Sequence, residues 1–239
     1  MKTLFSEIQG LFERTYASVG INLEECLIDS RRSRQLEALA GAQARELSSL
    51  ARTFLRTAGD RLHVGIYYSQ WLVEQLEKND PRAGLSEENI RALIPFVEEI
   101  NHAIHAALHF LRGERPSGDE SYARDLELQA QVDTYLVLLL FAAFFRRPGG
   151  ITEADRKWLR FHMFESRSDP PYQSTSLRAR YLETTELAAS YTRFLEGIHA
   201  ARRAHEIQTF HALGYDEKRT RILRLCDRTE SHPERSRDS

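Results

Sequence analysis

Apolar and polar positions alternate along most of this chain with the period of an α-helix. In the segment 86–112, for example, apolar residues recur every three or four positions, a spacing that places them on one face of a helix. Ala, Leu, Glu and Arg are frequent, and these residues favour helix on intrinsic propensity. The pattern predicts helices at 3–18, 23–57, 61–78, 86–112, 120–146, 153–165, 176–212 and 216–228.

Four glycines punctuate this helical pattern at regular intervals. Gly20, Gly84, Gly150 and Gly214 are each followed by an apolar or aromatic residue and then by Asn, Ser, Thr or Asp, at spacings of 64, 66 and 64 residues. Glycine accepts the left-handed backbone that closes a helix, and the small polar residue caps the next helix. The spacing therefore predicts four tight helix–Gly turn–helix corners and an internally repeated layout of about 65 residues.

These elements predict an all-α fold, an antiparallel bundle of seven or eight helices. Short connections place sequence neighbours antiparallel to one another. We expect one all-α domain over residues 1–229, and the polar loops at 113–119 and 166–176 mark where subdomains would separate. The charged tail at 230–239 is expected to be disordered.

Three features of the sequence predict a cytoplasmic protein: its N-terminal segment, its longest apolar run and its cysteines. The N-terminal segment lacks the apolar core and cleavage site of a signal peptide. The run YLVLLLFAAFF at 135–145 is shorter than the roughly 20 residues of a membrane span, which predicts a core helix. Cys26 and Cys226 have no metal-binding spacing and are expected to be free thiols, with a long-range disulfide between them as the alternative.

A net charge of −2 conceals two segments of opposite sign. Residues 31–63 contain seven arginines against three acidic residues, and residues 70–133 contain thirteen acidic against six basic residues. On a helix, Arg45, Arg52 and Arg56 would lie on one side, where they would pair with carboxylates of the acidic stretch within the monomer or across an interface. These three arginines are the candidate interaction residues, with Glu98, Glu120, Asp125 and Glu127 as carboxylate partners.

Two Glu-x-x-His motifs are the strongest catalytic pattern in the chain. They are Glu99 with His102 and Glu196 with His199. On a helix, residues three apart share a face, and two such motifs, with one Glu from each of two further helices, build the di-iron site of ferritin-like bundles. However, the apolar stripe of the segment 86–112 directs Glu99 and His102, together with His105 and His109, away from the core, and Glu196 points away from its own stripe.

The sequence therefore favours a non-enzymatic function. We expect a helical interaction or scaffold subunit that binds a protein partner or a second copy of itself, with no cofactor and no metal. One alternative is a di-iron carboxylate oxidase using the four motif residues. A second alternative is an arginine-mediated nucleic-acid-binding or helical nuclease module. P-loop, dinucleotide-binding, nucleophile-elbow and HExxH motifs are all absent from the sequence.

Overall fold

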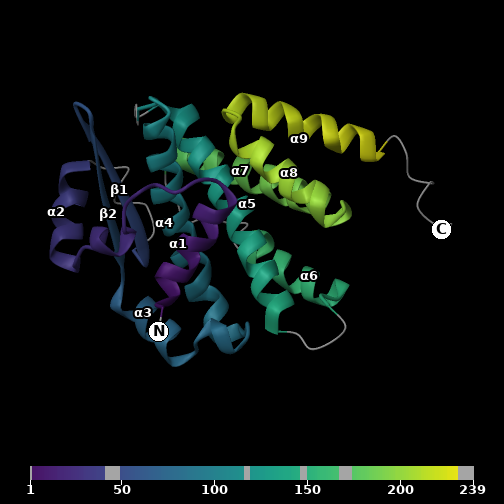
Figure 1. Cartoon of the computed structure of the whole chain (residues 1–239), viewed down its shortest axis with the longest axis horizontal. Coiled ribbons are helices and arrows are strands. Elements are labelled where there is room, and N and C mark those ends of the chain that lie inside the picture. The colour runs from purple at the N-terminus through teal and green to yellow at the C-terminus, as the bar shows by residue number, and fades with distance from the viewer. Residues whose placement is uncertain (1, 41–48, 116–118, 146–149, 167–173, 231–239) are drawn as a thin grey trace.

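Two long helices, α4 (Glu87–Leu111) and α5 (Glu120–Phe145), form the centre of the fold (Figure 1). The computed structural model describes residues 2–40, 49–115, 119–145, 150–166 and 174–230. Helix α4 lies between α5 on one side and a β-hairpin on the other, and α5 in turn packs against α7 (Thr175–Gly197). Both central helices are therefore covered on more than one face, which explains why most residues of α4 are buried.

The hairpin consists of β1 (Ala51–Ala58) and β2 (Arg61–Tyr68). The strands are antiparallel, and the pairing of Ala58 with Arg61 leaves Gly59 and Asp60 as a two-residue loop. Gly59 has a φ of 61°, as expected for a glycine in the first loop position of a tight hairpin turn. A short 3-10 helix (Leu23–Cys26) and α2 (Ser30–Ala40) precede the hairpin, and α2 lies at the outer edge of the molecule, against β2 (Figure 1).

The hairpin interrupts two predicted helices, so the predictions for 23–57 and 61–78 are wrong where the strands form and hold for α2 and for α3 (Gln70–Lys78). The segment TFLRTAGDRLHVGIYY is rich in β-branched and aromatic residues on both sides of the glycine turn, and these residues favour strands. Within the described residues, the helical class holds for the rest of the fold, which is mostly helical with this one small sheet.

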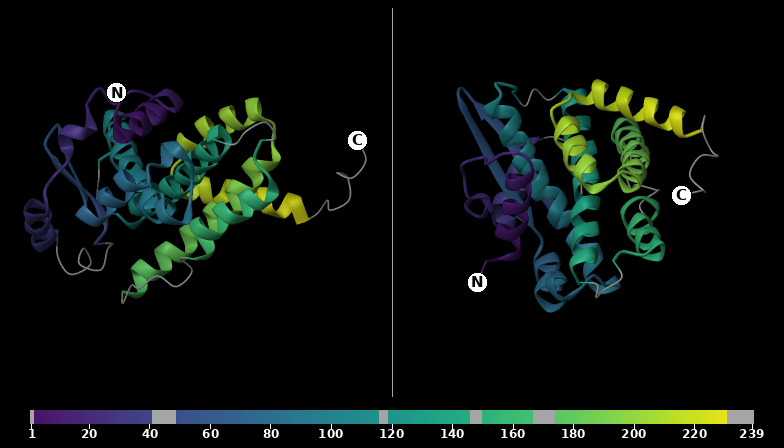
Figure 2. Two further views of the ribbon diagram at one scale, coloured as in Figure 1. Left: turned by 90° about the horizontal axis from the view of Figure 1, so that it is seen from below. Right: turned by 45° about the vertical axis from the view of Figure 1, so that its right-hand side comes forward.

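The remaining elements surround the central pair (Figures 1 and 2). Helices α1 and α3 pack on α4, while α6 and α9 pack on α5. A π-helical turn continues α6, and a 3-10 turn precedes α4. The bounds are α1 (Leu4–Thr15), α3 (Gln70–Lys78), the 3-10 turn Pro81–Ala83, α6 (Glu153–Arg160), the π-helical turn Phe161–Glu165, α8 (Ala200–His211) and α9 (Tyr215–Glu230).

The predicted helix 176–212 is two helices. It breaks after Gly197, because Ile198 adopts an extended backbone (φ −103°, ψ 150°) and His199 then caps α8. Glycine is a weak helix former, so a break at this position needs little compensation. The predictions for 86–112 and 120–146 match α4 and α5 to within one residue at each end.

The predicted corners differ in their backbone conformation. Gly20, Gly84 and Gly150 have positive φ values of 73°, 133° and 68°, whereas Gly214 does not have positive φ. Ser86 and Thr152 each form a capping box at the start of the following helix. The regular spacing is not accompanied by a repeat of secondary structure, because the first interval holds the hairpin and the second holds α4 and α5.

Helix α5 is long and apolar enough, by length and composition, to cross a membrane. However, 67% of that stretch is buried within the protein, as is typical of a central core helix. Of the described residues, only this helix meets both conditions.

Candidate functional site

A row of polar residues lies in the contact between α4 and α5. Asn101, His105 and His109 follow one another at intervals of four on α4, and Asp125, Gln129 and Asp133 do so on α5. Residues four apart on a helix share a face, so each helix directs three polar side chains towards the other. All six residues are at most 5% exposed, so this row is a polar contact buried within the core.

Asp133 organises one end of the row. Its Oδ2 accepts hydrogen bonds from Asn101 Nδ2 at 2.7 Å and His105 Nε2 at 2.9 Å, and its Oδ1 accepts one from the Tyr16 hydroxyl at 2.5 Å. Burial lowers the pKa of His105, although the Asp133 carboxylate opposes this effect. Burial and the neighbouring Asp133 carboxylate together raise the pKa of Tyr16. The three donors satisfy the Asp133 carboxylate without any group from outside the protein.

Asp125 organises the other end of the row, where it contacts two basic side chains. Its Oδ2 lies 3.2 Å from His109 Nε2, and its Oδ1 lies 3.0 Å from Nζ of the fully buried Lys218 of α9. The other ring nitrogen of His109, Nδ1, lies 2.5 Å from Glu114 Oε2. Because both ring nitrogens face carboxylates, the protonated form of His109 is favoured.

The pKa values at this end follow from burial and from the paired charges. Burial alone would lower the pKa of His109, but Asp125 and Glu114 raise it above its usual value. Burial lowers the pKa of Lys218, and the Asp125 carboxylate only partly offsets that effect. The pKa of Asp125 is lowered: burial alone would raise it, but His109 and Lys218 outweigh burial.

His211 of α8 closes the cluster. Its Nε2 accepts a hydrogen bond from Arg112 Nη2 at 2.6 Å, and its ring lies 4.5 Å from that of His105 and 4.2 Å from that of Tyr16. Burial lowers the pKa of His211, and nearby His105, Arg112 and Lys218 lower it further. The cluster thus combines three cationic side chains with three carboxylates, namely Arg112, His109 and Lys218 with Glu114, Asp125 and Asp133.

An apolar groove between α1, α5 and α8 reaches the edge of this cluster. The groove has a volume of about 280 Å³, and Tyr16 and Asp133 form the part of its wall that belongs to the cluster. Most of the remaining wall is apolar, including Leu11, Leu136, Leu140 and Ile207. The groove is therefore suited to apolar side chains.

The polar groups of the groove are already engaged within the protein. Tyr16 donates to Asp133, and Asp133 accepts two further hydrogen bonds from α4. Arg203 donates to the carbonyl oxygens of Leu195 and Ile198 at the end of α7. Tyr16, Asp133 and Arg203 therefore have hydrogen-bonding partners within the protein, and most of the remaining groove wall is apolar.

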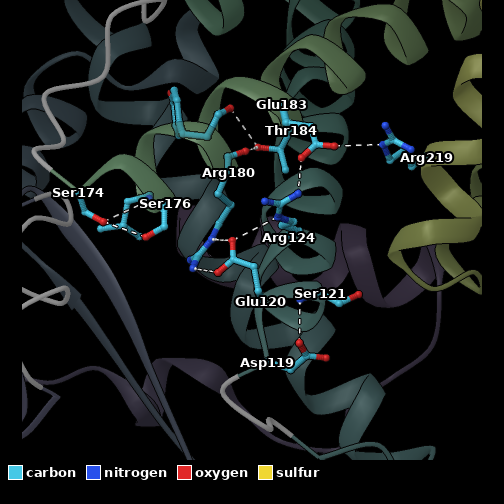
Figure 3. Close-up of polar contacts among 12 residues, drawn as sticks. Asp119, Glu120, Ser121, Arg124, Ser174, Ser176, Arg180, Glu183, Thr184 and Arg219 are labelled. Carbon is cyan, nitrogen blue, oxygen red and sulfur yellow. Dashed lines mark hydrogen bonds and ion pairs between the residues drawn. The ribbon is translucent and has the colours of Figure 1, made fainter.

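A second polar network lies nearer the surface, between α5, α7 and α9 (Figure 3). Glu120 accepts two hydrogen bonds from Arg180, at 2.9 and 2.6 Å, and one from Arg124. Arg124 also binds Glu183, whose other oxygen lies 3.1 Å from Arg219 Nε. All of these groups are partly exposed, so this network connects the helices without enclosing a site.

The three predicted interaction arginines do not form one face of a helix. Arg45 lies outside the described residues, and Arg52 and Arg56 are on strand β1. Arg52 is only 6% exposed and pairs with Glu37 of α2 at 2.9 Å, while Arg56 is exposed. The prediction of a helical arginine face fails here because the segment forms a hairpin.

The acidic partners predicted for these arginines have neighbours within the chain. Asp125 and Glu120 are paired as described above, and Glu127 lies 3.8 Å from His102. Glu98 is only 8% exposed on α4. The acidic stretch therefore does not form an exposed carboxylate surface at these four positions.

The outward direction predicted for the histidines of α4 is wrong for His105 and His109, which are 1% and 5% exposed. The prediction assumed a helix with one covered face, but α4 is covered on both sides. Glu99 and His102 are half-buried, and Glu99 Oε2 lies 3.7 Å from His102 Nδ1. Burial alone would lower the pKa of His102, whereas Glu99, Glu127 and Glu98 raise it to about 9.

The second motif is divided between two helices. Glu196 is on α7, where it accepts a hydrogen bond from Arg160 at 2.6 Å and another from the Tyr135 hydroxyl. It is 11% exposed, so its predicted outward direction is also wrong. His199 is the N-cap of α8, and its Nδ1 accepts from the backbone N–H of Ala201. In the described part of the chain, no group of three or more His, Cys, Asp or Glu residues has the arrangement of a metal site.

The buried cluster was not predicted from the sequence, although a signal for it exists. The spacing of Asn101, His105 and His109 is itself helical, and the same spacing recurs at Asp125, Gln129 and Asp133. Two polar rows at matching intervals, each inside a strongly apolar segment, indicate two helices that pair through polar contacts. The contributions of Tyr16, His211 and Lys218 depend on tertiary packing and had no such signal.

The chain matches no protein-family model, no curated protein and no solved structure. The proposals below therefore rest on the geometry of the described residues alone.

Proposed function

We propose that this protein is a non-enzymatic helical interaction subunit, and that the apolar groove between α1, α5 and α8 receives side chains of a protein partner. The main support for this function is the groove, which has a volume of about 280 Å³ and a mainly apolar wall. Its polar groups already have partners within the protein. A ligand would therefore gain mainly from burying apolar surface.

Exposed apolar residues beside the groove support this proposal. Leu140 and Phe144 of α5 are 48% and 79% exposed, although the helix to which they belong is otherwise a core element. Burying apolar area contributes roughly 25 cal/mol per Å², so a partner covering both residues would gain several kcal/mol of the kind that drives protein association. Contiguous exposed apolar surface of this sort commonly marks an interaction site.

We also propose a bundle architecture and a cytoplasmic location for this chain. We place the chain among helical bundles, with α4 and α5 as its antiparallel centre and the hairpin as an addition on one side. A repeated unit of about 65 residues is supported by the glycine spacing alone, because the secondary structure differs between the intervals. Cys26 and Cys226 are both free thiols, which supports a reducing compartment such as the cytoplasm.

Site-specific photo-crosslinking in cells that express the protein tests the proposed function. We expect a photoreactive amino acid at Leu140 or Ile207, both in the groove, to capture the same protein. Adding the bulky Ala143→Trp substitution, which fills the groove, should abolish both adducts. The control position is Leu223 of α9, which is 44% exposed and does not line the groove. Failure to form an adduct at either groove position, or an equal yield at Leu223, would refute the proposal.

A further inference from the structure

One face of the protein combines the outer side of α1 with the C-terminal end of α5. Glu7, Leu11 and Arg14 of α1 and Leu140 and Phe144 of α5 surround a second cavity of about 320 Å³. Leu11 and Leu140 line both this cavity and the groove, so the two hollows adjoin. Helix α1 lies at the outer edge of the fold (Figure 2, left), so a partner can approach this face.

The charges on α1 are arranged so that the face is complementary to itself. Glu7 and Arg14 are seven residues apart, which places them about two helical turns and about 10 Å apart on one side of α1. Their midpoint falls beside Leu11. A two-fold axis at that point would place Glu7 of each copy opposite Arg14 of the other, forming two ion pairs around an apolar centre.

A third charged residue on this rim contributes little net charge. Arg82 is already paired with Asp80, whose Oδ2 lies 2.7 Å from Arg82 Nη2. Arg82 also lies 3.8 Å from Glu7, whose side chain is 41% exposed. Arg14 is exposed and Glu7 is 41% exposed, so a partner can reach both of these charges of α1.

The shape of the face has the same property, because it carries both a projection and a hollow. Phe144 is 79% exposed beside the 320 Å³ cavity that Leu11 and Leu140 help to line. In an isologous dimer each copy supplies the same patch, so a projecting ring in one copy can enter the hollow of the other. Binding of a different protein would not require this surface to be complementary to itself.

We infer that the partner received by this face is a second copy of the chain, in a two-fold dimer centred on Leu11 and Leu140. This inference rests on the proposed function, since it identifies the protein that the apolar surface binds. The dimer buries Leu140 and Phe144 at its centre and places the two Glu7–Arg14 pairs at its rim. A polar rim around an apolar centre is the usual anatomy of a protein interface.

Light scattering coupled to size exclusion, followed by sedimentation over a range of concentrations, tests the dimer. We expect the full chain to have twice its 27.6 kDa mass and Leu140→Glu to have the monomer mass. The matched control is Leu223→Glu, since Leu223 and Leu140 are similarly exposed, at 44% and 48%. A monomeric wild-type chain at all concentrations, or equal effects of the two substitutions, overturns the inference.

A charge exchange tests the geometry of the dimer. Arg14→Glu places a carboxylate opposite Glu7 of the second copy, so we expect dimer affinity to fall by at least about tenfold. Combining Glu7→Arg with Arg14→Glu reverses both charges and should restore most of that affinity. Circular dichroism spectra like that of the wild-type chain would show that the variants fold. If the double variant is as weak as Arg14→Glu, the two-fold arrangement is wrong.

The two proposals fail in different ways. A monomer whose groove positions still capture another protein would overturn the dimer and leave the proposed function standing. A monomer without crosslinks at Leu140 or Ile207 would overturn both.

Discussion

Lys218 is a buried lysine whose ammonium group is paired with a carboxylate. Its side chain is fully buried, and its Nζ lies 3.0 Å from Asp125 Oδ1. Asp125 also neutralises His109. A buried charge that loses its partner keeps its desolvation cost without the compensating attraction, so removing one member of such a pair is much more harmful than replacing both.

We therefore expect Asp125→Asn to lower the free energy of unfolding by about 3–5 kcal/mol. Combining Asp125→Asn with Lys218→Met removes the stranded ammonium group while the amide oxygen can still accept from His109, so this double variant should cost less than Asp125→Asn alone. Urea denaturation followed by circular dichroism measures both. The control is Glu114→Gln, because Glu114 contacts the same histidine but is 53% exposed. Equal costs for Asp125→Asn and Glu114→Gln would show that the buried pair does not stabilise the fold in this way.

At the scale of single elements, the glycine corners provide a comparison within one chain. Gly150 has a φ of 68° and precedes α6, whereas Gly214 precedes α9 without positive φ. A Cβ at Gly150 would meet no atom within 4 Å, so any penalty there comes from the backbone and not from crowding. The two glycines have similar sequence contexts, but only the backbone at position 150 has the left-handed conformation that favours glycine.

We expect Gly150→Ala to destabilise the protein by about 1 kcal/mol, because L-residues disfavour the left-handed region. Gly214→Ala should have little effect, since a Cβ there would lie 4.0 Å from the nearest atom, Glu217 Oε2. Thermal denaturation of both variants in one buffer measures the difference. Equal melting temperatures for the two variants would contradict the distinction that we draw between these corners.

The elements also show how far the sequence predicts the fold. Helical periodicity located α4 and α5 almost to the residue because each is long and contains a continuous apolar pattern. It failed in the segment that forms β1 and β2, where helix-favouring Arg, Leu and Ala outweighed the β-branched residues around Gly59. The buried cluster was missed for a different reason: the direction of His105 depends on what covers α4, which is a property of tertiary packing.

At the scale of the whole molecule, four histidines near the α4–α5 contact divide into two pairs with opposite pH effects. The pKa values of His102 and His109 are raised, so their stabilising contributions are fully present below about 6.5 and are lost as pH rises through the raised values. The pKa values of His105 and His211 are lowered. As pH falls below about 6.5, the unfolded chain gains protons at these positions before the folded chain does, so stability falls.

Considering these histidines alone, we expect the free energy of unfolding to be greatest near pH 6.5 and to decrease on both sides. His102→Gln should flatten the decrease between about pH 6.5 and 9, because the pKa of His102 is raised to about 9. His211→Gln should flatten the decrease on the acid side, since the amide oxygen can still accept from Arg112. Urea denaturation across this pH range measures both effects. Parallel pH profiles for the wild-type chain and both variants would show that other groups set the pH dependence.

The row of polar residues between α4 and α5 also has a consequence for how the chain chooses one arrangement. Leucine and alanine surfaces tolerate a shift of one helix along another by a turn, because one apolar contact resembles the next. Such a shift here would move Asp125 away from His109 and Asp133 away from Asn101 and His105, leaving buried charges without partners. The row therefore stabilises one register of the two helices over the others. The groove, whose wall includes Asp133, forms only in that register.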